Sequence, residues 1–169
     1  MLVSTKNAKD ETMDNKQATP IELAYLAGII DGEGWIGLQK RLQRKWITYK
    51  PALRITNTDA NIINVVRKIW ENVGVDGHIY ENDQQPSVPN GKQILNIQLN
   101  KQSDIKRILD AVIPYLVGKK ARAEMLLKFL DKTIDREEAY LAIKQANQKG
   151  KSSETTRETP QGEDIVQAA

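Results

Sequence analysis

Two acidic side chains, Asp31 and Glu33, stand at the end of a segment whose apolar residues recur at helical spacing. Carboxylates are poorly placed at a helix C-terminus, because the unpaired carbonyls there already carry partial negative charge. Mg²⁺ and Ca²⁺ bind the same kind of oxygen cluster, so a divalent ion would resolve the conflict. The alternative is that Asp31 only makes a turn with Gly32 and that Glu33 faces solvent.

The composition narrows the chemistry of any metal site. The chain has 169 residues with no cysteine and one histidine, which excludes thiol catalysis and leaves no thiolate or multi-histidine zinc site. Any metal must therefore be bound by oxygen atoms. The longest apolar stretch, residues 24–30, is too short to cross a membrane, and we expect a soluble intracellular protein without a membrane partner.

Two glycines lie inside the same helical segment. Gly28 and Gly32 are four residues apart and therefore share one helical face. Each glycine costs a helix roughly 1 kcal/mol relative to alanine. We infer that the glycines are kept because another helix approaches this face closely.

The charge of the chain is unevenly distributed. The net charge is only +3, but residues 34–58 contain six basic residues and no acid. A cationic stretch of this kind favours binding to a polyanion.

The periodicity of the apolar residues changes along the chain in a regular order. It predicts helices over residues 21–31, 59–73, 103–116, 119–130 and 135–145, and strands over residues 35–43, 46–57, 78–81 and 94–99. Thr58 or Asp59 is expected to cap the second helix and Ser103 the third. This order predicts an α+β fold in which helices cover one face of an antiparallel sheet. Residues 1–20 are expected to form a flexible arm, residues 21–144 the domain, and residues 145–169 a polar, disordered tail.

Residues 26–34 read LAGIIDGEG, and this string resembles the defining motif of the LAGLIDADG homing endonucleases. The resemblance extends over the element order from about residue 21 to residue 130. It implies an αββαββα core with a four-stranded antiparallel sheet, followed by C-terminal helices. The chain is similar to the members that carry one motif and act as homodimers. In those members the motif helices pack together, which implies a dimer interface at Ala27, Gly28, Asp31 and Gly32.

The resemblance also implies a catalytic site. Glu33 would bind Mg²⁺ with help from the backbone carbonyl of Gly32, and Ca²⁺ would bind there without supporting cleavage. Asn57 takes the place of a residue that orders water near the scissile phosphate, and Lys119 takes the place of an active-site lysine. For Lys119 the alternative is a solvated residue at a helix start. No small-molecule cofactor is implied.

The implied reaction is metal-dependent hydrolysis of a long, partly palindromic double-stranded DNA site, which leaves 3′ overhangs. DNA would be read by the open face of the sheet, where arginine, glutamine and asparagine can pair with base edges. The residues expected on that face are Gln39, Arg41, Gln43, Thr48, Lys50, Arg54, Tyr80, Asn82, Asn96 and Gln98. The alternative is that these are ordinary solvent-facing strand residues, although the acid-free cationic stretch favours DNA.

Two other functions are compatible with the fold. An RNA maturase would use a similar sheet and dimer to assist the splicing of its own intron, without a need for metal-dependent cleavage. A transcription regulator built on a decayed motif should carry an additional DNA-binding domain, which neither terminal segment can form. Glu33 together with Lys119 favours a retained nuclease.

Overall fold

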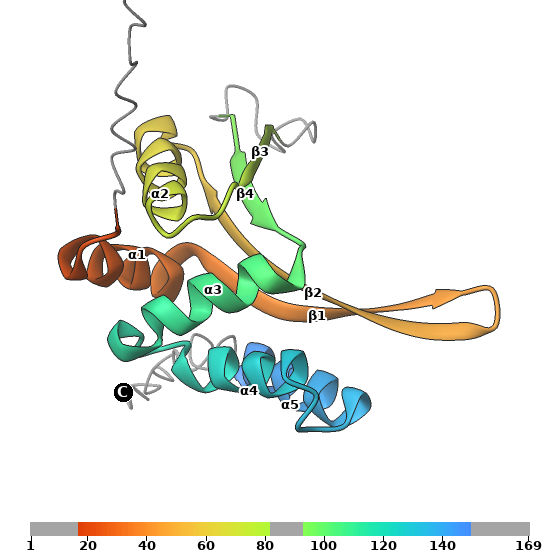
Figure 1. Ribbon diagram of the computed structural model, residues 1–169. Helices are drawn as coiled ribbons and strands as arrows, with labels where there is room; N and C mark the ends of the chain where they lie inside the picture. The colour runs from red at the N-terminus through yellow and green to blue at the C-terminus, as the bar shows by residue number, and fades with distance from the viewer. Residues whose placement is uncertain (1–16, 82–92, 150–169) are drawn as a thin grey trace, which may run out of the picture.

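The computed structural model describes residues 17–81 and 93–149, and its helices and strands follow the order predicted from the sequence (Figure 1). The elements are α1 (Pro20–Glu33), β1 (Gly34–Gln43), β2 (Trp46–Asn57), α2 (Ala60–Asn72), β3 (His78–Glu81), β4 (Leu95–Leu99), α3 (Gln102–Val112), the 3₁₀ turn η1 (Ile113–Tyr115), α4 (Lys120–Leu130) and α5 (Arg136–Lys149). Residues 1–16, most of the expected arm, and residues 150–169 of the expected tail lie outside the described residues. No helix in the described part of the chain is long and apolar enough to span a membrane.

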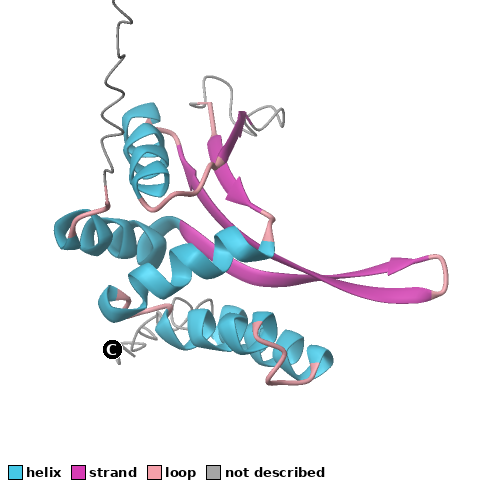
Figure 2. Cartoon of the chain, viewed as in Figure 1, coloured by secondary structure: helices cyan, strands magenta, loops and turns pink. Residues whose placement is uncertain are grey.

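The four strands form one antiparallel sheet in the order β1-β2-β4-β3, which confirms the predicted α+β fold. The inward residues of the three longest strands are buried in the core that they share with α1, α2, α3, α4 and α5. Figure 2 shows that the helices lie to one side of the sheet and that the β1–β2 ribbon extends beyond them toward its turn. The second face of the sheet is therefore not covered by any helix of the described residues.

At three helix ends the structure either chooses between the predicted residues or differs from the prediction. Asp59 rather than Thr58 caps α2, because its Oδ1 accepts the Asn61 N–H at 2.8 Å. The expectation for Ser103 is wrong, because α3 begins at Gln102 and the Ser103 hydroxyl donates to Asp104 instead of capping the helix. Helix α5 continues to Lys149, beyond the predicted end near residue 145.

A cluster of polar and aromatic side chains joins the β1–β2 ribbon to α5. The Glu137 carboxylate accepts hydrogen bonds from Lys40 Nζ at 2.7 Å and from the Tyr49 hydroxyl. The Tyr49 and Tyr140 rings lie 5.9 Å apart between their centroids, and Lys40 Nζ lies within 6 Å of both centroids. The ribbon is thus held to α5 at the edge of the core, against which Tyr140 packs.

This cluster generates a prediction about pH. The hydrogen bonds from Lys40 and Tyr49 lower the pKa of Glu137 in the folded chain. Its contribution to stability is therefore present above the ordinary carboxyl pKa and is lost as the pH falls through the lowered value. Glu137→Gln should be less stable than the wild type at pH 7 in urea unfolding, and the difference should shrink below about pH 4.

Glu138→Gln is the matched control, because it removes the same charge one residue further along, from a carboxylate with no hydrogen bond or ion pair in the described part of the chain. A difference for Glu137→Gln that stays constant down to pH 3 would contradict the prediction.

Candidate active site and nucleic-acid interface

The carboxylate of Asp31, near the C-terminal end of α1, binds the backbone that leads into α4. Its two oxygens accept hydrogen bonds from the N–H groups of Val117, Gly118 and Lys119, at 2.8, 3.1 and 2.8 Å. These donors lie just before α4 begins, where a helix leaves N–H groups unpaired and favours negative charge. Asp31 is unfavourable for its own helix but stabilises the start of α4.

Lys119, the N-cap residue of α4, makes the complementary contact. Its ammonium donates to the carbonyls of Ile30 at 2.8 Å and of Asp31 at 2.7 Å, with Gly32 at 3.4 Å. These carbonyls are at the end of α1, where a cation is favoured. The ammonium therefore supplies a positive charge at the carbonyl cluster, where the sequence predicted that a divalent ion would be needed.

The pKa values of both groups reflect this arrangement. Burial alone would raise the pKa of Asp31, but the three backbone N–H donors and the charge of Lys119 outweigh it and lower that pKa. Burial and the charge of Arg122 lower the pKa of Lys119, while Asp31 and Glu33 act in the opposite direction. Asp31 is consequently held as an anion at neutral pH.

Glu33 is the last residue of α1, directly beside the contacts of Asp31 and Lys119, and it is exposed. Its carboxylate has no hydrogen bond or ion pair within the described residues, and its charge acts on Lys119. Across residues 17–81 and 93–149, no group of three or more acidic or histidine side chains could hold a metal ion. One chain thus offers the Glu33 carboxylate and the Gly32 carbonyl, which are suitable but too few to surround an ion.

Asn57 lies at the end of β2, and its side chain is only partly exposed. Its Oδ1 accepts the Asp59 N–H at 2.8 Å, so the amide NH₂ is the group left to bind water or phosphate. In the register of the strands, Asn57 lies two residues after Ile55, which pairs with Gly34, the residue next to Glu33. The structure therefore brings Glu33, Lys119 and the end of β2 to the same corner of the fold.

The register places the predicted DNA-reading residues of the described strands on one face. Arg54 pairs with Trp35 in β1 and with Gln98 in β4, and the residues that alternate with Arg54 along β2 point to the same side. The residues on this face are Gln39, Arg41, Gln43, Thr48, Lys50, Arg54, Tyr80, Asn96 and Gln98. Asn82 lies outside the described residues.

One member of this set does not fit the prediction. Asn96 is 4% exposed, and its Oδ1 accepts a hydrogen bond from the Thr56 hydroxyl at 2.7 Å. The expectation that Asn96 presents an open amide to DNA is therefore wrong, because a neighbouring strand satisfies and covers it. Lys50, Arg41 and Gln43 are exposed as predicted.

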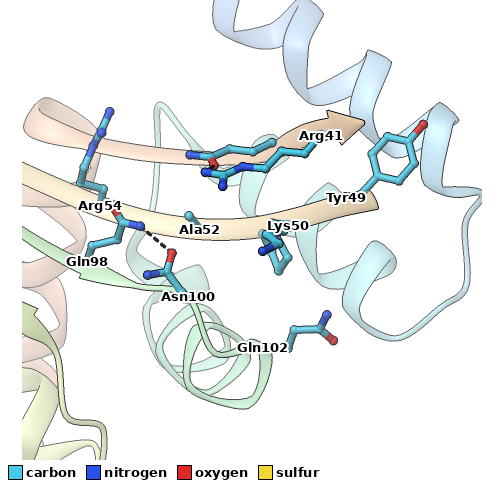
Figure 3. Close-up of a pocket in the computed structure, with 10 residues that line it drawn as sticks. Arg41, Tyr49, Lys50, Ala52, Arg54, Gln98, Asn100 and Gln102 are labelled. Carbon is cyan, nitrogen blue, oxygen red and sulfur yellow. Dashed lines mark hydrogen bonds between the residues drawn. The ribbon is translucent and has the colours of Figure 1, made fainter. Parts of the chain in front are cut away.

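The polar face is hollowed over β2. Ala52 is 2% exposed and pairs with Gly37, so the two smallest residues of this face lie next to each other. Around Ala52 is a cavity of about 710 Å³, with cations and amides along its sides (Figure 3). Its lining is Gln39, Arg41, Tyr49, Lys50, Pro51, Ala52, Arg54, Gln98, Asn100 and Gln102. The lining contains three cations and no acid, which suits an anionic ligand rich in hydrogen-bond acceptors.

The residues predicted at the dimer interface are in different environments. Ala27 is fully buried in the core of its own chain, so its assignment to the interface is corrected: it has no surface left for a partner. Asp31 is used by the contacts to the start of α4. Gly28 and Gly32 are exposed, and a Cβ added to either would meet no atom within 4 Å. The close contact inferred from these glycines is therefore absent among the residues that the structure describes.

Sequence reasoning missed two features. Ile21 and Tyr25, 83% and 45% exposed, lie on the same side of α1 as the two glycines. Trp35, to which no role was assigned, lies beside Arg54 on the open face. The helical spacing of Ile21, Tyr25 and Gly28 could have revealed the first feature, but the second depends on strand register.

Comparisons with known proteins agree on the fold. A family model described as a LAGLIDADG-like domain matches residues 20–112. The homing endonuclease I-CvuI bound to the I-CreI target is 19% identical with a TM-score of 0.60, over 76% of this chain and 81% of that one. The archaeal intron-encoded homing endonuclease I-Vdi141I complexed with DNA is 15% identical with a TM-score of 0.57, over 87% and 89%. No curated protein sequence gives a significant match.

The contacts of Asp31 lead to a testable prediction. Asp31→Asn removes the charge and one acceptor oxygen, so the start of α4 loses charge-assisted hydrogen bonds and Lys119 loses the opposite charge that acts on it most strongly. We expect the free energy of unfolding in urea to fall by about 1–2 kcal/mol at fixed protein concentration. Asp110→Asn, which removes an exposed i,i+4 ion pair with Lys106, should change it by less than about 0.5 kcal/mol. Equal effects of the two substitutions would contradict this interpretation.

Proposed function

This chain belongs to the LAGLIDADG-like domain family, and from that premise we propose that it is a homing endonuclease. It would bind a long, partly palindromic DNA site as a homodimer and hydrolyse both strands in a metal-dependent reaction that leaves 3′ overhangs. One observation carries the proposal: the exposed Glu33 carboxylate, unpaired within the described residues, lies beside the Lys119 ammonium. Both are at the inner end of the β1–β2 ribbon, next to a polar sheet face whose cavity is lined by no acid. No other part of the described chain combines these features.

The sheet face supplies the DNA-binding surface in this proposal. A twisted antiparallel ribbon fits the major groove, and the β1–β2 ribbon extends beyond the helices where DNA can approach it (Figure 1). Arg41, Lys50 and Arg54 contribute positive charge, and the amides beside them can pair with base edges. The similar proteins I-CvuI and I-Vdi141I were solved with DNA, which supports the same ligand here.

The oxygen atoms at the end of α1 suit a divalent ion. Glu33 has a free carboxylate, and the Gly32 carbonyl is only weakly engaged, at 3.4 Å from Lys119 Nζ. Mg²⁺ held there would stabilise charge on the phosphate oxygens and supply hydroxide at neutral pH. Structures of I-CvuI were solved in the presence of Mg, with the DNA not cleaved, and in the presence of Ca, which supports the use of a divalent ion. The proposal takes Mg²⁺ as the cofactor and Ca²⁺ as a substitute that binds without supporting cleavage.

The chain's own residues position the phosphate. Lys119 holds a positive charge next to Glu33, where it attracts the DNA backbone and stabilises charge that develops during cleavage. The amide NH₂ of Asn57 can hold water near the same corner. Because one chain offers a single free carboxylate there, a partner chain would supply the second Glu33.

The exposed side of α1 supports the homodimer. Ile21, Tyr25, Gly28 and Gly32 recur at the spacing of one helical face, and all four are exposed. In the proposed dimer a partner helix would cover Ile21, which is 83% exposed in the single chain. Two copies of α1 could approach closely at the glycines, which would bring both Glu33 carboxylates to the centre of the dimer.

Glu33→Gln tests the nuclease. It keeps the size of the side chain but removes the charge that would bind the metal, so double-strand cleavage of a plasmid library of long, partly symmetric sites should be lost in Mg²⁺ at equal DNA occupancy. Glu124→Gln, an exposed acid on α4, should cleave like the wild type. Binding without cleavage by the wild type itself would contradict the proposal and favour the maturase, with intron RNA as the next ligand.

Gly28→Leu tests the dimer. The added side chain has open space in the single chain, so the fold should be retained while close approach of a second α1 is blocked. Sedimentation at micromolar concentration should show a dimer for the wild type and a monomer for the variant. Ala121→Leu, at an exposed position on α4, should remain a dimer. A wild-type monomer with full activity would defeat the homodimer.

A further inference from the structure

Trp35 and Arg54 form a cation–π pair on the open face of the sheet. They are partners across β1 and β2, and the Arg54 Cζ lies 5.6 Å from the centroid of the Trp35 ring. At this distance a guanidinium is attracted to the face of an indole ring. Arg54 is thus held by an aromatic ring, which leaves its hydrogen-bond donors available, whereas a carboxylate partner would occupy them.

Gly37 makes this position of the ring possible. The Trp35 ring lies along the strand over Gly37, and a Cβ at Gly37 would be only 2.4 Å from Cζ2 of the ring. Any other residue at this position would push the ring away from the strand. The glycine and the tryptophan therefore form one unit that supports Arg54.

Arg54 is also incompletely satisfied. Its Nε is buried and has no hydrogen-bond partner within the described residues. A buried donor without an acceptor costs free energy, and such a group calls for an explanation, for example water, an ion or a functional role. Arg54 lies at the edge of the acid-free cavity over Ala52, so an acceptor from a bound ligand can approach its guanidinium there (Figure 3).

We propose that Trp35 is a positioning residue that holds Arg54 ready to read a guanine close to the bonds that are cut. This inference rests on the proposed DNA function. Arginine pairs in bidentate fashion with O6 and N7 of guanine, and a guanidinium fixed in a plane loses less freedom when it does so. The alternative partner for the Arg54 guanidinium is a DNA phosphate, whose binding would not depend on base sequence.

The position within the DNA site follows from the register. Trp35 is two residues beyond Glu33, so its pair with Arg54 lies at the inner end of the ribbon. Arg41 pairs with Thr48, six residues along β2 from Arg54, which is about 20 Å at 3.3 Å per residue. Arg54 therefore reads a base pair nearer the centre of the site than Arg41 does.

The test compares base preferences of full-length variants. Wild type, Trp35→Leu, Trp35→Phe, Arg54→Lys and the control Trp46→Leu would each select sites from a random DNA library in Ca²⁺, after thermal unfolding confirms that each variant is folded. Trp46 is a second tryptophan, 78% exposed next to the β1–β2 turn and not opposite Arg54 in the register. Arg54→Lys identifies the position that Arg54 reads.

At that position and its symmetry mate, Trp35→Leu should lose guanine preference by about 10-fold, which corresponds to about 1.4 kcal/mol. Trp35→Phe should retain most of the preference because it keeps an aromatic face, and Trp46→Leu should not change it. An unchanged guanine preference in Trp35→Leu would overturn this inference but not the proposed function. So would uniformly weaker binding without a change in preference, which indicates a phosphate contact. A wild type that selects no sequence would overturn the proposed function as well.

Discussion

The exchange of charges between α1 and α4 is the interaction on which the rest of the site depends. The Asp31 carboxylate is unfavourable at the C-terminal end of α1 but favourable at the N-terminal end of α4, which it contacts. The Lys119 ammonium is unfavourable at the N-terminal end of α4 but favourable at the C-terminal end of α1, whose carbonyls it binds. Each therefore stabilises the other's helix, through backbone groups that would otherwise be unpaired at the helix ends. This exchange ties the segment that delivers Glu33 to the segment that delivers Lys119, so the two side chains keep a fixed relation although they are far apart in the sequence.

The same junction sets the geometry of the sheet. Because α1 runs directly into β1, the position of Glu33 determines where the inner end of the ribbon begins, and the strand pairing then places Trp35 and Arg54 beside it. Further out, Lys40, Tyr49 and Glu137 fix the ribbon to α5. The polar face is therefore supported at two points, at the α1–α4 junction and at α5, and remains open between them around Ala52.

Local patterns predicted much of this arrangement. The alternation of polar and apolar residues identified the open face correctly for Arg41, Lys50 and Arg54, since side-chain direction in a strand follows from a period of two. Burial by a neighbouring strand does not follow from that period, and Asn96 was accordingly assigned wrongly. Ala27 was misjudged for a related reason: a residue of the motif helix can face its own core as readily as a partner. Ser103 shows that a good capping residue does not fix a helix start when the preceding backbone already adopts the helix.

The sequence by itself determined the class of fold, the order of its elements, the motif helix and the conflict of charge at its end, because these depend on local propensity, on periodicity and on residue type. Only the tertiary structure decided how that conflict is resolved within the chain, because the answer is a lysine 88 residues away whose ammonium lies on the carbonyls of α1. It also decided that the Trp35 ring lies beside the Arg54 guanidinium, because the pairing of β1 with β2 sets which side chains are neighbours. Contacts between distant residues depend on how whole elements pack, and no window of sequence contains that information.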